Sequence, residues 1–194
     1  MKSGTQVKSI IRKHVFEDFL RKVDSQLTHP EEVYITGGAA LSFYDIRSTF
    51  SDVDFFQSVS PNLERAMQSV NPGLTKLCNA DAATLAWDYD YVDWQNGVSE
   101  QLGLKNIRVK VPPLEFLLVS KCCSMRFDPS NENSDDKDVW KIVEKLGIQT
   151  IDEIEHYVHQ YGLEHRFSDR SKAITKDIIE AIQKHDSYNP LIAR

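Results

Sequence analysis

The sequence predicts an α/β (α+β) fold: a short mixed sheet with helices on one face, followed by a C-terminal helical lobe. Three observations support this prediction. Short apolar runs alternate with helical patterns up to residue 111. Pro112-Pro113 then separates this region from the rest of the chain. The later segments have helical periodicity. We therefore expect a core domain with an N-terminal helix at residues 1–112 and a helical lobe at residues 113–194.

The core half of the chain alternates between expected helices and strands. Apolar residues from Ile10 to Val23 recur at helical spacing and predict an amphipathic helix over residues 6–27. Residues 71–73, Asn-Pro-Gly, predict a turn. The other expected elements are strands at residues 33–36, 52–57 and 107–111, helices at 39–44 and 60–70, and two or three strands within 74–94.

The helical lobe is expected to contain four helices. Gly147 is placed to end one of them, and Thr150 with Glu153 predicts a capping box at the start of the next. A polar loop at residues 128–134 follows the first helix. The expected helix ranges are 114–125, 135–146, 150–161 and 168–185.

Composition narrows the classes of function. The 194 residues carry a formal net charge of −6, which argues against a strong general affinity for nucleic acid or an anionic membrane but leaves room for a local basic patch. No apolar run approaches the ~20 residues that span a bilayer, and the N-terminal residues lack the apolar region of a signal peptide. Cys78, Cys122 and Cys123 are expected to be reduced thiols in a cytoplasmic protein with no membrane partner.

Gly37-Gly38 follows a short apolar run that ends at Ile35 and opens a helical segment. Glycine allows a tight turn and lets a phosphate approach the backbone closely. The helix that begins there points its free N–H groups at an anion. Paired glycines between a strand and a helix are usually only a turn, so this motif needs a second feature beside it.

Asp52 and Asp54 are that second feature. Residues two apart in a strand face the same way, so both carboxylates lie on one side while Val53 and Phe55 face the core. Two carboxylates this close repel each other unless a cation lies between them, and Mg²⁺ (or Mn²⁺) prefers carboxylate and phosphate oxygens. The glycine turn and the acidic strand together predict a site for a metal-bound nucleoside triphosphate.

The block that runs from Gly37-Gly38 to Asp52-Val53-Asp54 resembles the signature of the DNA polymerase β-like nucleotidyltransferase superfamily. The downstream sequence is similar to the minimal nucleotidyltransferases of the AbiEii type, which are toxins of type IV toxin–antitoxin systems. The downstream residues that carry this likeness are Val109–Leu118, Lys121, Arg126 and Lys137-Asp138. The resemblance covers roughly residues 30–146.

The resemblance implies a nucleotidyltransferase fold and an enzyme that moves a nucleoside monophosphate from a nucleoside triphosphate to an acceptor hydroxyl. The acceptor would be the 3′ end of a tRNA or another RNA, a protein, or a small molecule, and a cognate antitoxin would be a partner. Asp52 and Asp54 would be catalytic and would hold Mg²⁺ or Mn²⁺. The implied nucleotide contacts are Gly37, Gly38, Ser51, Lys121 and Asp138.

Two positions depart from the family pattern. The family more often has serine in place of Gly38, so Ser42 or Ser51 is expected to supply the hydroxyl that is lost. The downstream Lys-Asp pair is often followed three residues later by a second aspartate, and Lys141 stands in that place here.

Enzymes of this superfamily usually add a third carboxylate from a later strand, which binds metal or accepts the proton of the attacking hydroxyl. The candidates are Asp88, Asp90 and Asp93. If Val92 and Trp94 face the core, Asp93 faces the open side, so we expect Asp93 to be the third catalytic acid. A shift of one residue in the register would make it Asp90 instead.

Lys121 is open to two interpretations. It shares a helix face with Leu114, Leu118 and Met125, so its stem could cover the core while its amine reaches water. Alternatively, it is a partly buried ammonium directed at the triphosphate.

The alternative to an enzyme is a catalytically inactive module on the same fold that binds nucleotide or another protein. Such a module would keep Asp52 and Asp54 but lack a base, so the third carboxylate separates the two hypotheses. Weaker candidates are a His156–His159 pair and a basic face at residues 166–176, for which a solvated helix surface is the simpler interpretation.

Overall fold

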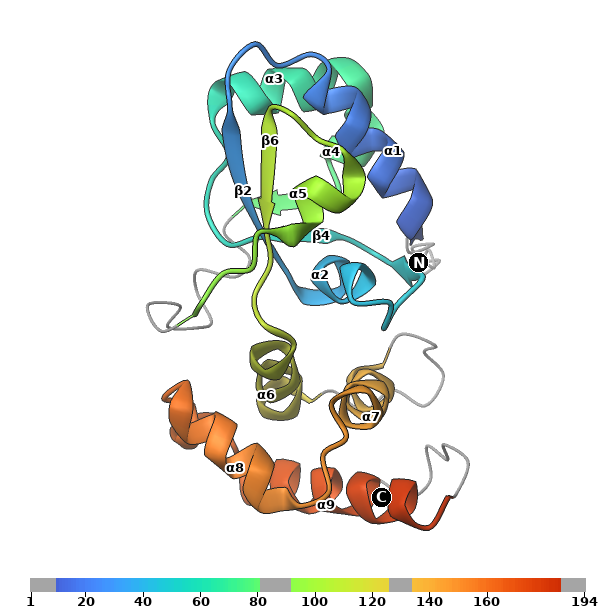
Figure 1. The fold of residues 1–194 in the computed structure, drawn as a ribbon, viewed down its shortest axis with the longest axis vertical. Helices are drawn as coiled ribbons and strands as arrows, with labels where there is room; N and C mark the ends of the chain where they lie inside the picture. The colour runs from blue at the N-terminus through green and yellow to red at the C-terminus, as the bar shows by residue number, and fades with distance from the viewer. Residues whose placement is uncertain (1–9, 81–91, 126–133, 186–194) are drawn as a thin grey trace, which may run out of the picture. The chain divides into compact units, whose positions relative to one another are not determined.

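A computed structural model describes residues 10–80, 92–125 and 134–185. These residues divide into two compact units, whose elements are drawn in Figure 1. The sheet unit comprises residues 10–80 and 95–111, and the helical unit comprises residues 92–94, 112–125 and 134–185. The division between Val111 and Pro112 lies one residue from the boundary expected from the sequence.

The sheet unit contains a four-stranded mixed sheet in the order β5-β4-β2-β6. Strand β2 (Glu31–Thr36) is antiparallel to β4 (Val53–Phe55) and parallel to β6 (Ile107–Lys110), and β5 (Cys78–Ala80) is parallel to β4. The unit's other elements are β1 (Ile11–Arg12), α1 (Lys13–Asp24), α2 (Gly37–Phe43), β3 (Thr49–Phe50), α3 (Pro61–Val70), α4 (Pro72–Thr75) and α5 (Gly97–Leu102). The expected α/β (α+β) class with a mixed sheet is confirmed.

One face of the sheet is buried and the other is partly open. The core face is formed by apolar residues that are each no more than 3% exposed: Val33, Ile35, Val53, Phe55, Ile107 and Val109. The alternating positions on these strands, which include Tyr34, Asp54 and Lys110, keep contact with solvent. The period of two therefore directs Asp54 away from the core, as the sequence predicts.

Helix α1 begins later than the helical spacing predicts. Residues 11–12 form β1 instead, and Ile11 pairs with Phe50 in an antiparallel ladder with β3. A strand partner far along the chain, together with the β-branched side chain of Ile11, outweighs the local helical pattern. Residues 6–9 of the expected helix lie outside the described residues.

The turn expected at residues 71–73 is the start of α4. The Asn71 side chain accepts a hydrogen bond from the Leu74 backbone N–H at 3.0 Å and caps this helix. The sequence also left α5 unpredicted, because six residues are too few to show a helical period.

Only part of the β-rich segment at residues 74–94 can be compared with its prediction. Strand β5 is present, whereas residues 81–91 lie outside the described part of the chain. Residues 92–94 have no regular secondary structure, so Asp93 does not lie on a strand as expected.

The helical unit follows its predicted order closely. Its helices are α6 (Leu114–Ser124), α7 (Asp135–Leu146), α8 (Ile151–Gln160) and α9 (Asp169–Gln183), with a 3₁₀ turn at Glu164–Arg166. Gly147 ends α7 at a φ of 69°. The Thr150–Glu153 capping box is confirmed, with each side chain accepting a hydrogen bond from the other's backbone N–H.

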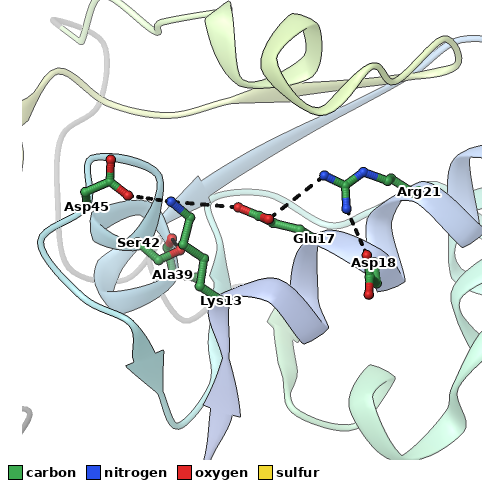
Figure 2. Close-up of polar contacts among 7 residues, drawn as sticks. All are labelled: Lys13, Glu17, Asp18, Arg21, Ala39, Ser42 and Asp45. Atoms are coloured by element: carbon green, nitrogen blue, oxygen red, sulfur yellow. Dashed lines mark hydrogen bonds and ion pairs between the residues drawn. The ribbon is translucent and has the colours of Figure 1, made fainter.

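A row of ion pairs on α1 reaches the turn after α2 (Figure 2). The Lys13 ammonium lies 2.6 Å from the Asp45 carboxylate and 3.8 Å from Glu17, and Glu17 lies 3.9 Å from Arg21. Asp45 has a left-handed φ of 59°, which is uncommon for a residue with a side chain. Exposed ion pairs contribute little to the free energy of unfolding. These pairs connect the turn at Asp45 to α1 through Lys13.

Asp24 joins the end of α1 to the segment that enters β6. Its carboxylate is 8% exposed and accepts hydrogen bonds from the backbone N–H groups of Lys105, Asn106 and Ile107 at 3.1, 2.6 and 2.7 Å. The Asn106 amide in turn donates to the backbone carbonyls of Asp24 and Leu27. This one carboxylate therefore satisfies three donors that would otherwise be left without protein partners.

Asp24→Ala is expected to lower the free energy of unfolding by about 3 kcal/mol, because it leaves the buried Ile107 N–H and two part-buried N–H groups without this acceptor. Urea denaturation measures the loss. Asp18→Ala, on the exposed side of the same helix, is the matched control and should change stability by less than about 0.5 kcal/mol. Equal losses for the two variants would contradict the role given to Asp24.

The cysteines are free thiols, as the sequence predicts. Burial raises the pKa of Cys78, Cys122 and Cys123 to about 12 in each case, so none of them is a thiolate near neutral pH. Within the described segments, no helix has both the length and the apolar character needed to traverse a bilayer.

Candidate functional site

The glycine turn and the acidic strand meet in the sheet unit. Thr36, the last residue of β2, is the antiparallel partner of Asp54 in β4, and Gly37 follows directly. A Cβ placed on Gly37 would lie 2.6 Å from Asp54 Oδ2, well inside van der Waals contact. Gly37 also has a φ of +64°. Both the backbone conformation and the carboxylate therefore require glycine at this position.

Asp54 lies on the open side of β4, and Asp52 directly precedes this strand, which is shorter than the strand expected at residues 52–57. Val53 and Phe55, which alternate with them, are 0% and 3% exposed, whereas both aspartates are half-buried. The exposed Ser51 hydroxyl donates a hydrogen bond to Asp52 Oδ1 at 2.9 Å. Ser51 thus orients the first carboxylate, and the turn at Gly37 borders the second.

Arg47 is a further charged residue at this turn, and the sequence analysis did not identify it. A Cβ on Gly38 would lie 3.0 Å from Arg47 Nη1 and 3.3 Å from Phe50 Cβ. A half-buried guanidinium therefore lies against the second glycine, beside the start of α2. No local pattern marked Arg47, because it lies in a polar connection whose path only the tertiary structure defines.

Ser42 does not supply the hydroxyl that Gly38 lacks. It is 0% exposed, and its hydroxyl donates to the Ala39 carbonyl at 2.6 Å within α2 (Figure 2). A side chain buried in this way cannot reach a phosphate. Of the two serines considered for this role, Ser51 is the one with an exposed side chain.

Gly37→Ala is expected to lower the free energy of unfolding by about 2–3 kcal/mol. The left-handed φ costs about 1 kcal/mol, and the new methyl group must displace the Asp54 carboxylate. Gly103→Ala is the matched control, because Gly103 has a φ of +69° with nothing within 4 Å of its added Cβ. Urea denaturation of both variants isolates the contact with Asp54, and equal losses would show that this contact carries no cost.

The donor set formed by Asp52 and Asp54 suits a hard divalent cation. Mg²⁺ is commonly held by one or two carboxylates together with water and substrate phosphate oxygens, so two half-buried aspartates are sufficient protein ligands. Among the residues with described positions, no group of three or more histidine, cysteine, aspartate or glutamate side chains could hold a metal ion. A cation here would therefore draw its remaining ligands from the substrate and water.

The helical unit brings together Lys121 and Asp138, two of the predicted nucleotide contacts. The Lys121 ammonium on α6 lies 2.6 Å from Asp135 Oδ1 and 3.2 Å from Asp138 Oδ2 on the first turn of α7. The three side chains are 14%, 6% and 3% exposed. Lys121 is therefore not a lysine that extends to water, and its charge is held between two buried carboxylates. Asp135 was not anticipated from the sequence.

Asp93, the predicted third acid, also belongs to the helical unit. It is exposed, whereas Val92 before it is 8% exposed and Trp94 is half-buried, which agrees with the expected alternation. Strand β5 is the neighbour of β4 in the sheet, and its Asn79 is the register partner of Asp54. Asp88 and Asp90 lie outside the described residues, and the role of Asp93 stays a prediction.

The weaker candidates behave as surface residues. His156 and His159 are both exposed, and His159 contacts Glu164. Lys172 pairs with Glu155, and Lys176 lies 4.0 Å from Glu180. Acidic partners therefore offset the positive charges of Lys172 and Lys176, two residues of the expected basic face.

No family model, curated protein or solved structure matches the chain. The resemblance to AbiEii-type nucleotidyltransferases therefore rests on the quoted motifs and stays a prediction.

Proposed function

We propose that the protein is a metal-dependent nucleotidyltransferase that transfers a nucleoside monophosphate from a nucleoside triphosphate to an acceptor hydroxyl. The contact between the Gly37 turn and the Asp54 carboxylate is the observation that carries this proposal. It places a backbone turn suited to a phosphate directly beside a carboxylate suited to a metal.

Each residue of the site has a definite role in this proposal. Asp52 and Asp54 would hold Mg²⁺, and Ser51 would keep the Asp52 carboxylate in place. The backbone at Gly37-Gly38 and the Arg47 guanidinium would receive the phosphates of the substrate. Mg²⁺, when bound, would offset the negative charge that develops on those phosphates.

The proposed reaction is an in-line displacement at the α-phosphorus. The acceptor oxygen forms a bond to this phosphorus, the bond from the α-phosphorus to the bridging oxygen of the β-phosphate breaks, and pyrophosphate leaves with that oxygen. The proton of the acceptor hydroxyl passes to a carboxylate, for which Asp93 is the predicted group. Lys121 is the predicted further nucleotide contact, oriented by Asp138.

A transfer assay tests the proposal. The protein is incubated with Mg²⁺, total RNA or lysate, and each α-labelled nucleoside triphosphate in turn. We expect one class of acceptor to become labelled when Mg²⁺ is present. No label should be transferred when EDTA removes the metal. Absence of transfer for all four nucleotides and all acceptors would refute the enzyme.

One observation favours the inactive nucleotide-binding module as a second candidate. Asp93, the predicted third acid, does not lie on a strand, so strand pairing does not hold a third carboxylate there beside β4. This module would bind a nucleoside triphosphate with Mg²⁺ and transfer nothing. Calorimetric titration with nucleotide, run beside the transfer assay, separates the two functions.

A further inference from the structure

Tyr161 is a buried aromatic residue whose hydroxyl makes no hydrogen bond within the described residues. It directly follows α8 and is 5% exposed. Its ring meets the Phe116 ring of α6 edge to face, with centroids 5.2 Å apart. The ring is therefore fixed by packing while the hydroxyl keeps contact with solvent. Polar groups on nearly buried side chains normally have a hydrogen-bond partner, so this hydroxyl marks a place for a ligand.

Two acidic side chains lie near this hydroxyl. Burial raises the pKa of Tyr161 to about 12, and Glu115, Tyr157 and Asp93 add to the rise in that order. A negative charge disfavours a phenolate beside it, so Glu115 and Asp93 lie on the side to which the hydroxyl points. Tyr157 lies one turn earlier on the same helix, and its carbonyl accepts a hydrogen bond from the Tyr161 N–H at 3.0 Å. The hydroxyl therefore faces a surface with two carboxylates and a second tyrosine.

Glu115 brings to this surface a charge that no cation offsets. It is half-buried on the first turn of α6, and no hydrogen bond or ion pair joins its carboxylate to any residue that the structure describes. In the same unit, by contrast, Asp135 and Asp138 share the Lys121 ammonium. A helix N-terminus favours an acidic residue such as Glu115. It does not explain why a tyrosine hydroxyl points to the same side.

We propose that the surface formed by Glu115, Asp93, Tyr157 and Tyr161 binds an arginine side chain of a partner protein. The guanidinium would donate hydrogen bonds to the Glu115 carboxylate and to the Tyr161 hydroxyl oxygen. The charge of Asp93 would add to the attraction, and the half-buried Tyr157 would border the planar group. This inference does not depend on the proposed nucleotide transfer.

The chemistry of the surface favours arginine over other cations. A guanidinium presents five N–H donors in a planar fork, which suits several acceptors at once. It is more weakly hydrated than an ammonium and stacks on aromatic rings, so it suits a surface bordered by Tyr157 and Tyr161. A metal ion fits less well, because the described residues include no group of three or more histidine, cysteine, aspartate or glutamate side chains that could hold one. The net charge of −6 also attracts a basic partner.

Fluorescence anisotropy with a short labelled peptide of glycine, serine and two arginines tests the inference. Glu115→Gln is expected to weaken binding about fivefold, because the charge is lost while the shape is kept. Tyr161→Phe, which keeps the ring contact with Phe116, should weaken binding about threefold. Glu144→Gln, at an exposed position on α7, is the matched control for a lost negative charge and should bind within about twofold of the wild type.

Two further peptides separate the guanidinium from other causes of binding. The same peptide with citrulline, the neutral isostere of arginine, should not bind. A peptide with lysine in place of arginine should bind about threefold more weakly, because an ammonium lacks the planar fork. Equal binding of the lysine peptide would contradict the choice of a guanidinium.

The inference is overturned if the wild type does not bind the arginine peptide, or if it binds the citrulline peptide equally well. An equal loss in Glu144→Gln and Glu115→Gln would overturn it as well, because the attraction would then come from the net charge alone. Circular dichroism checks that each variant is folded. If Tyr161→Phe does not fold, Glu115→Gln and the citrulline peptide still decide the outcome.

Discussion

Asp54→Asn is expected to reduce nucleotide transfer by about a thousandfold and to leave the protein folded. The amide has nearly the shape of the carboxylate, so its contact with the Gly37 turn is retained. It loses the charge that holds a metal ion beside the substrate phosphates. The labelled transfer assay measures the loss, and circular dichroism confirms the fold. Asp18→Asn, an exposed carboxylate paired with Arg21, is the matched control and should retain full activity.

The same variant makes a second, independent test in thermal melts. Mg²⁺ with a nucleoside triphosphate should raise the melting temperature of the wild type, because a ligand that binds only the native state stabilises it. This increase should be absent in Asp54→Asn. The melting temperature of each protein without ligands is the baseline for this comparison. Transfer activity within tenfold of the wild type would contradict the role given to Asp54.

The local parts of the site could be predicted from the sequence. The alternation of Asp52 and Asp54 with Val53 and Phe55 determines which side each residue faces, and one strand is enough to reveal it. The capping box at Thr150 and the stop at Gly147 are local for the same reason. Each depends on residues within a few positions of one another, so no knowledge of the tertiary structure was needed.

The parts that escaped prediction depend on residues far apart in the sequence. Asp24 binds backbone groups about eighty positions away, and nothing in its surroundings marks it as different from other helix-end aspartates. Residues 11–12 form a strand only because residues 49–50 lie beside them. Arg47 lies in a connection whose path only the tertiary structure defines. The pairing of Tyr34 with Lys110 depends on strand order and register, which a single sequence does not reveal.

Lys121 has a structural role in the helical unit, and its contact with a nucleotide stays a prediction. The sequence placed it on an apolar helix face and left open whether it reached water or substrate. The structure places its ammonium between Asp135 and Asp138, all nearly buried. A charge held in this way is pre-organised, and the same ion pairs are needed for the packing of α6 against α7.

Lys121→Met is expected to lower the free energy of unfolding by about 3–5 kcal/mol, because it removes a cation from two buried carboxylates. Urea denaturation measures the loss. Lys145→Met, at an exposed position on α7, is the matched control and should change stability by less than about 0.5 kcal/mol. The triple variant Lys121→Met, Asp135→Asn, Asp138→Asn should recover part of the loss, since a buried ion network replaced as a whole costs less than one broken by a single change.

The loss of unfolding free energy in Lys121→Met decides how the nucleotide-transfer activity of this variant is interpreted. If stability falls as expected and the triple variant recovers it without recovering nucleotide transfer, the pair formed by Lys121 and Asp138 is needed for substrate as well as for packing. If the triple variant recovers both, the role of Lys121 is structural and the nucleotide contact implied by the resemblance is wrong. A loss below about 1 kcal/mol in Lys121→Met would contradict the structural role given to its ion pairs with Asp135 and Asp138.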